Sequence, residues 1–229
     1  MNYDAIHEGI FRARPNRFIA HVEINGRIER CHVKNTGRCR ELLVPGAKVY
    51  LHQPRALPAS QRATKYDLTA VWKGEQLINM DSQAPNKVFA EYMRSGRYRE
   101  DITLIKPETK YGGSRFDFYV ETGKSKIFIE VKGVTLEENG VALFPDAPTE
   151  RGVKHLNDLA QCIHDGYKAQ VVFIIQMKGI SHFKPNNRTH AAFGEALAKA
   201  AAEGVAVLAL DCAVTPHSLT IGDPVPVEI

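Results

Sequence analysis

The stretch "RFDFYVETGKSKIFIEVKGVTL", residues 115–136, consists of two apolar runs joined by a polar turn that contains a glycine. These runs are otherwise built from Phe, Ile and Val, yet they carry Asp117, Glu130 and Lys132. Burying an unpaired charge inside a protein is costly. The three charged residues therefore need partners, either in solvent or in a functional site.

A turn centred between Gly123 and Lys124 predicts that Asp117 lies opposite Glu130 on the neighbouring strand. Because side chains alternate along a strand, Glu130 and Lys132 share a face. Two carboxylates directly opposite each other have Cβ atoms about 5 Å apart and repel each other. A divalent cation such as Mg²⁺ fits between them, and an adjacent ammonium group can position a water or stabilise developing phosphoryl charge. The hairpin therefore predicts metal-assisted phosphodiester hydrolysis.

The alternative is a solvent-facing hairpin in which Glu130 and Lys132 form a surface ion pair worth at most about 1 kcal/mol. The order of the surrounding elements favours the functional site. A helix precedes the two charged strands, and a helix followed by a buried strand comes after them.

Residues 17–80 contain short β-type runs separated by turns, including a hairpin signal at Asn25-Gly26. This pattern predicts a small OB-like β-barrel, a class that commonly binds nucleic acid. The pattern changes near residues 81–85, so we predict two domains, 1–82 and 83–229.

The second domain is predicted to have the order αβββαβαβ, a mixed β-sheet flanked by helices. Its first helix has Asn86 as the expected N-cap and Gly96 at the end, and its second helix runs from Thr149 to about His164. The whole chain is thus predicted to belong to the α/β (α+β) class.

Composition places the chain among globular proteins, with 44% hydrophobic residues and no uninterrupted apolar run long enough to span a membrane. We expect a cytoplasmic protein without a membrane partner. Its four cysteines form no CxxC pair, which argues against a disulfide framework or a zinc knuckle. Residues 1–80 hold 13 Lys and Arg against 7 Asp and Glu, an asymmetry that favours a polyanionic partner for this segment.

Candidate nucleic-acid contacts occur in both halves of the chain. In the first half they are Arg12, Arg14, Arg17, Asn35, Arg38 and Arg40. Phe18 is expected in the core, with stacking on a base as the alternative. In the second half, Arg151 and His155 lie four residues apart on one helix face, where they either hold a phosphate or face solvent.

The arrangement D(x12)ExK on consecutive strands, preceded by a helix with an acidic residue, resembles the PD-(D/E)xK nuclease core. A longer resemblance, to the bacterial sugar fermentation stimulation protein family, covers nearly the whole chain. It rests on "RFIAHVEINGRIERCHVKNTGRCRELLVPGAKVYL" (17–51), "YGGSRFDFYV" (111–120), "IEVKGVTLEENGVALFPDAPTERGVKHLNDL" (129–159) and "GVAVLAL" (204–210).

These resemblances imply an N-terminal OB-like domain, a nuclease-like C-terminal domain and binding of DNA, with RNA as an alternative partner. They imply Mg²⁺ or Mn²⁺ held by Asp117 and Glu130, with Lys132 completing the motif and Glu91 as the carboxylate that the helix supplies. The four residues Glu91, Asp117, Glu130 and Lys132 form the predicted catalytic set.

Two hypotheses remain open from the sequence. The first is a DNA-binding protein with a metal-dependent nuclease site. The second is a non-catalytic DNA-binding regulator of sugar (maltose) catabolism genes that keeps the nuclease-like fold as a scaffold. A sugar- or nucleotide-binding enzyme has little support, because the chain contains no glycine-rich phosphate loop.

Overall fold

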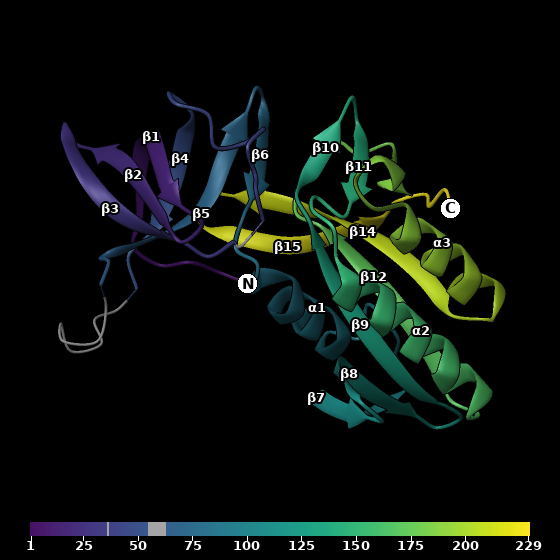
Figure 1. Cartoon of the computed structure of the whole chain (residues 1–229). Helices are drawn as coiled ribbons and strands as arrows, with labels where there is room; N and C mark the ends of the chain where they lie inside the picture. Colours follow the sequence, from purple (N-terminus) through teal and green to yellow (C-terminus); the bar gives the residue numbers. More distant parts are fainter. Residues whose placement is uncertain (36, 55–62) are drawn as a thin grey trace.

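The computed structural model describes residues 1–35, 37–54 and 63–229, and it confirms the predicted α/β class (Figure 1). The first part of the chain forms a β-barrel whose strand pairs are antiparallel, except for the pair that closes it. The closed ring consists of β1 (Ile6–Asn16), β2 (Ile19–Ile24), β3 (Arg27–Val33), β4 (Lys48–His52) and β5 (Tyr66–Lys73), and β6 (Gln76–Asn79) pairs with β5 outside the ring.

The barrel closes because β3 and β5 pair in parallel, in addition to the sheet order β3-β2-β1-β4-β5-β6. The predicted hairpin at Asn25-Gly26 is confirmed, and both residues have positive φ angles, as a two-residue hairpin turn requires. Strand β1 was not predicted. Its sequence is rich in charged residues, and only Gly9 and Phe11 are buried, so it lacks the alternation by which strands are recognised.

The second part of the chain is built on a mixed sheet with the order β15-β14-β12-β9-β8-β7. These strands are β7 (Ile102–Tyr111), β8 (Ser114–Thr122), β9 (Lys126–Val134), β12 (Lys168–Ile175), β14 (Ala206–Thr215) and β15 (Ser218–Pro224). A small sheet, absent from the prediction, contains β10 (Leu136–Glu138), β11 (Val141–Phe144) and β13 (His182–Pro185). Its strands have only three or four residues, too few to show a period.

Helix α1 (Ala84–Arg94) covers one face of this sheet, whereas α2 (Glu150–His164) and α3 (Asn187–Ala202) cover the other (Figure 1). Helix α2 begins as predicted, and the Thr149 hydroxyl accepts a 3.0 Å hydrogen bond from the Gly152 amide. The predicted cap of α1 is wrong. The helix begins two residues before Asn86, because Pro85 is well tolerated in a first turn.

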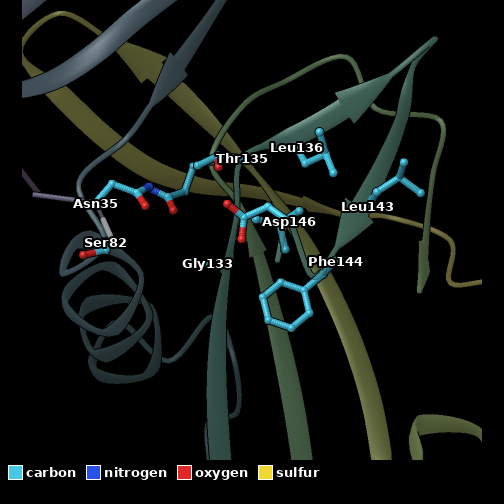
Figure 2. Close-up of a pocket in the computed structure, with 10 residues that line it drawn as sticks. Asn35, Ser82, Gly133, Thr135, Leu136, Leu143, Phe144 and Asp146 are labelled. Carbon is cyan, nitrogen blue, oxygen red and sulfur yellow. The ribbon is translucent and has the colours of Figure 1, made fainter. Parts of the chain in front are cut away.

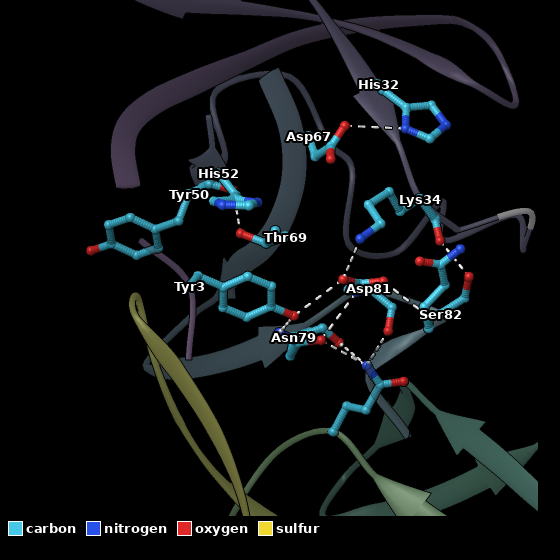
Figure 3. Close-up of polar contacts among 12 residues, drawn as sticks. Tyr3, His32, Lys34, Tyr50, His52, Asp67, Thr69, Asn79, Asp81 and Ser82 are labelled. Atoms are coloured by element: carbon cyan, nitrogen blue, oxygen red, sulfur yellow. Dashed lines mark hydrogen bonds and ion pairs between the residues drawn. The ribbon is translucent and has the colours of Figure 1, made fainter. Parts of the chain in front are cut away.

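A buried polar cluster joins the two parts of the chain (Figure 3). Asp81 is fully buried, and it accepts hydrogen bonds from Lys34 Nζ at 2.7 Å and from the hydroxyl of Tyr3 at 3.3 Å. Directly after β12, the side-chain amide of Gln176 donates to the carbonyl and the side chain of Asn79. These contacts connect the end of the barrel to the sheet that carries the charged hairpin.

All four cysteines are free and buried, as the sequence indicates. Phe18 is half exposed, so its expected place in the core is wrong. The side chain of Asn16 accepts from the amides of Phe18 and Ile19 and makes a turn before β2, which takes Phe18 out of the alternation. Over the described ranges, no helix has the length and apolar character needed to cross a membrane.

Candidate active site

Strands β8 and β9 pair in the predicted register, from Phe118 opposite Ile129 to Glu121 opposite Lys126. The ladder ends at Phe118, and the carboxylate of Asp117 instead accepts a 2.7 Å hydrogen bond from the amide of Val131. The side-chain alternation also breaks here, since Phe118 packs on the α1 face whereas Phe116 packs against His155 of α2. Asp117 thus lies where the two strands separate, between the two faces of the sheet.

Asn86, in the first turn of α1, holds the other oxygen of this carboxylate. Its Nδ2 donates to Oδ1 of Asp117 at 2.7 Å. Burial, followed by the nearby charge of Glu130, raises the pKa of Asp117 to about 6, against the opposing effect of the two hydrogen bonds. Burial and the second carboxylate therefore both disfavour ionisation of Asp117.

Glu130 is buried, with 4% of its surface exposed. Its Oε1 accepts from Lys132 Nζ at 2.6 Å and hydrogen-bonds to Nδ1 of His155. Burial works to raise the pKa of Glu130, but the hydrogen bond from His155 and the charge of Lys132 outweigh it and hold the pKa below its usual range. Its Oε2 is buried without a hydrogen-bond partner among the described residues.

His155 reaches Glu130 from α2 and is itself buried. Nε of Arg151 donates to its Nε2 at 3.4 Å, so Nε2 is the acceptor and Nδ1 carries the proton that is donated to Glu130. This fixes the tautomer and the ring orientation. His155 thus contacts the carboxylate of Glu130, which the sequence did not predict, and Arg151 is exposed at the edge of the site.

Glu91 does not join this cluster. Its carboxylate forms a 2.6 Å ion pair with the N-terminal ammonium group, which also donates to the carbonyl of Leu219 on β15. Strand β15 is at the opposite edge of the sheet from β8 and β7. Helix α1 therefore brings Asn86, near its beginning, to the site and carries Glu91, near its end, away from it.

A basic recess adjoins the cluster of Asp117, Glu130, Lys132 and His155. Its lining includes the tip of the β7–β8 hairpin and one side of α2, with the cationic residues Lys110, Arg115, Arg151 and Lys154. Lys154 is partly engaged, because it donates to Ser114 and to Asp158 at 2.6 Å.

A second basic recess lies on the barrel and is lined by Arg17, Arg38 and Arg40 together with Asn16 and Ala147. All three predicted arginines are exposed there. Arg12 is not part of its lining and is ion-paired with Glu23 at 2.6 Å. Arg14 also lines this recess, and its guanidinium donates to main-chain carbonyls of residues 17, 35, 37 and 38.

The remaining predicted contact, Asn35, accepts from the amide of Gly37 and lines a cavity between the two parts of the chain. Sequence reasoning missed Asn86 as a partner of Asp117. The sequence does place an amide side chain in the helix that precedes the charged strands. Whether that amide reaches Asp117 depends on the residue at which the helix begins.

Comparison with known proteins agrees with this architecture. The model of the "SfsA N-terminal OB domain" matches residues 13–80, and that of the "Sugar fermentation stimulation protein RE domain" matches residues 83–218. The chain belongs to the sugar fermentation stimulation protein family.

Members of this family resemble the chain over its whole length. The homolog from Desulfitobacterium hafniense strain Y51 is 60% identical and that from Ruminiclostridium cellulolyticum is 56% identical, each over all of this chain and 99–100% of the relative. A solved structure of Pyrococcus furiosus SfsA, described as a complex with Ca²⁺, has a TM-score of 0.89 and 30% identity, and the match covers 100% of this chain and 98% of that one.

Proposed function

We propose that this protein binds DNA and hydrolyses its phosphodiester bonds with Mg²⁺ or Mn²⁺ at the site formed by Asp117, Glu130 and Lys132. The observation that carries the proposal is the unpartnered oxygen Oε2 of Glu130, buried near the carboxylate of Asp117. A buried carboxylate oxygen without a partner is costly in a folded protein and calls for a bound group. The raised pKa of Asp117 indicates that a positive charge would relieve the repulsion.

The residues present fit a hard divalent cation. Asp117 and Glu130 would hold it with carboxylate oxygens, the ligands that such ions prefer. Within residues 1–35, 37–54 and 63–229, no three His, Cys, Asp or Glu side chains are grouped to hold a metal. This suits Mg²⁺, which binds through one or two carboxylates and keeps waters and substrate oxygens as its other ligands. The Ca²⁺ described for the Pyrococcus furiosus relative supports a cation of this kind in the family.

When bound, such a cation supplies positive charge that stabilises the negative charge developing on the phosphate. The residues of the chain orient the groups around it. Lys132 is mostly buried, and its ammonium would hold a reacting water or a phosphate oxygen while it keeps Glu130 ionised. Asn86 and the amide of Val131 fix the carboxylate of Asp117, and His155 fixes that of Glu130.

The two basic recesses support DNA as the substrate. Exposed guanidinium and ammonium groups bind phosphates and release counterions, which gives affinity without sequence preference. The recess beside His155 would hold the phosphates next to the scissile bond, and the recess at Arg38 and Arg40 would hold the strand on the barrel. RNA carries the same phosphates and is the alternative substrate to compare.

The test is cleavage of labelled single-stranded DNA, duplex DNA and RNA with Mg²⁺, Mn²⁺ or EDTA. We expect cleavage that needs the metal and disappears in the Asp117→Ala/Glu130→Ala variant. Equal product from the wild type and this variant would assign the cleavage to a contaminant and remove the enzymatic proposal.

A second candidate is a non-catalytic DNA-binding regulator of sugar catabolism genes. It is favoured by the name of the family. It predicts salt-dependent DNA binding that is unchanged in the Asp117→Ala/Glu130→Ala variant, with no cleavage under any metal condition.

A further inference from the structure

A cavity of about 100 Å³ lies between the barrel and the second sheet, beside the candidate active site (Figure 2). Gly133, the residue that follows Lys132 on β9, is part of its wall. The polar residues that line it are Asn35, Ser82, Thr135, Asp146 and Gln176. The volume of this cavity is enough for several water molecules. It is therefore also enough for the edge of a planar heterocyclic ring.

The polar groups available to a ligand in this cavity are mainly acceptors. Asp146 has no hydrogen-bond or ion-pair partner among the residues that the structure describes, and Figure 2 shows its carboxylate inside the cavity. Gln176 is only 1% exposed and uses its Nε2 in hydrogen bonds at the junction, whereas its Oε1 has none within the described chain. Thr135, 8% exposed, likewise has a hydroxyl without a described partner.

The carboxylate of Asp146 is closely seated. A Cβ atom added to Gly37 would lie 2.3 Å from its Oδ2, so only glycine fits at this point of the loop. An anionic wall of this kind repels a phosphate and attracts N–H donors. The other wall is apolar, with Val134, Leu136, Leu143 and Phe144. Such an apolar wall offers a hydrated cation no favourable contact, whereas the face of an aromatic ring can pack against it.

Positive charge lies close by, outside the cavity. Gly37 and Ala147 line the recess that contains Arg17, Arg38 and Arg40. Asn35, two residues before Gly37, and Asp146, directly before Ala147, line the cavity. Arg14 fixes the loop that separates the two through its four main-chain hydrogen bonds. A nucleotide can therefore place its phosphate on the arginines and its base in the cavity.

Among the four bases, guanine fits these acceptors best. Its Watson–Crick edge presents two adjacent donors, N1–H and the 2-amino group, which match the two oxygens of a carboxylate. Adenine has a single donor group on that edge, and thymine has one N–H between two acceptors. This edge is free only in an unpaired or flipped-out nucleotide.

We propose that this cavity binds an unpaired guanine of the DNA strand that is cut at Asp117, Glu130 and Lys132, with Asp146 as the residue that reads the base. The inference rests on the proposed binding of DNA. It makes the substrate a single-stranded or locally opened DNA, in which guanine sets the position of the strand relative to the site.

The test measures binding of the full-length protein to labelled pentanucleotides in EDTA, so that cleavage does not interfere. The oligonucleotides d(TTGTT), d(TTATT) and d(TTITT) differ only at the central base, and hypoxanthine (I) lacks the 2-amino group of guanine. We expect about tenfold tighter binding of the guanine form than of the adenine form, with hypoxanthine in between. The nearly isosteric variant Asp146→Asn should lose this preference, because its amide presents one acceptor in place of two.

Two controls keep the outcomes apart. Thr135→Val, which keeps the shape of the cavity, should reduce the preference less than Asp146→Asn, and thermal melting verifies that both variants fold. Salt-dependent binding with no preference for guanine, or a preference unchanged in Asp146→Asn, would overturn the cavity proposal and leave the nuclease proposal standing. A third outcome is that Ca²⁺ or K⁺ stabilises the wild type but not Asp146→Asn, and that no base is preferred. The cavity would then be a cation site, and the proposal that it binds guanine would be overturned. Absence of all DNA binding and all cleavage would remove the proposed function itself.

Discussion

Nδ1 of His155, on α2, hydrogen-bonds to Oε1 of Glu130, on β9, and both side chains are buried. Since Lys132 donates to the same oxygen, Oε1 is fully occupied, and Oε2 is left for a ligand from outside the chain. Helix α2 thereby orients the carboxylate of Glu130 through the oxygen that is not available to a ligand.

We expect the loss of this contact to weaken the site without removing a group that touches the phosphate. His155→Ala should lower cation affinity or cleavage by about 10- to 100-fold, the usual cost of losing a residue that orients a ligand. His155→Asn, whose amide can replace the Nδ1 donor, should recover a large part of it. Titration of cleavage against Mn²⁺ separates lost affinity from lost turnover, and equal losses in both variants would contradict the orienting role.

The pKa of Asp117 makes stability depend on pH. In the folded protein it is about 6, above the value of 3.8 for an unperturbed aspartate, so the folded state holds the proton more tightly than the unfolded state. The resulting stability is present below about pH 4 and is lost as the pH rises through 6. Asp117→Asn should therefore be more stable than the wild type above pH 6, by up to about 3 kcal/mol, with the difference vanishing near pH 4.

Thermal melting in EDTA across this pH range measures that difference. Added Mn²⁺ should stabilise only the wild type, and more at pH 7.5 than at pH 5, because at low pH a proton competes for Asp117. A pH-independent difference between the two proteins would show that the pKa of Asp117 is not raised in the folded protein.

The buried pair of Lys34 and Asp81 should matter for folding. Replacing Lys34 with Met leaves the charge of Asp81 buried without its partner, which we expect to cost about 3–5 kcal/mol of unfolding free energy. The matched control is Lys48→Met, which breaks an exposed pair with Glu8 and should cost less than about 1 kcal/mol. Denaturant unfolding measures both values, and similar costs would argue against a structural role for the junction.

The arginines of the barrel recess should contribute to DNA affinity through phosphates. Arg38→Ala and Arg40→Ala should each weaken binding for all sequences and reduce the slope of log K against log salt by about 1. Arg12→Ala is the control, because this arginine is ion-paired with Glu23 outside the recess. Its effect on the slope should be clearly smaller, and an equal effect would mean that the DNA path is broader than the recess.

Substitution of Glu91 tests whether this residue belongs to the active site. Because it pairs with the N-terminal ammonium group beside β15, Glu91→Gln should change cleavage less than twofold. A loss comparable to that of Glu130→Gln would mean that α1 supplies the carboxylate expected from the nuclease resemblance after all.

Local patterns were enough to predict the register of the charged hairpin and the start of α2. A two-residue turn and side-chain alternation fix the first, and the Thr149 cap fixes the second. The contacts within the site were harder to predict, because they join segments that are far apart in the sequence. Asn86 and His155 reach Asp117 and Glu130 from opposite faces of the sheet. The periodicity of hydrophobic residues along the sequence does not predict either contact.

The same limit explains the error at Phe18 and the main-chain contacts of Arg14 that the sequence did not predict. Alternation predicts a buried Phe18, but the turn made by Asn16 removes it from the strand. A basic side chain near a Gly-containing loop is typical of a phosphate contact, yet the carbonyls of that loop occupy Arg14. In both cases a tertiary or turn contact overrides the composition of the segment.

The central claim is that the carboxylates of Asp117 and Glu130 share a divalent cation. The most direct measurement is a crystal soaked with Mn²⁺ and studied at the manganese absorption edge. We predict an anomalous peak within coordination distance of Asp117 and of Oε2 of Glu130, absent from crystals of Glu130→Ala. A site that stays empty at millimolar Mn²⁺, or a peak that does not contact either carboxylate, would contradict the account.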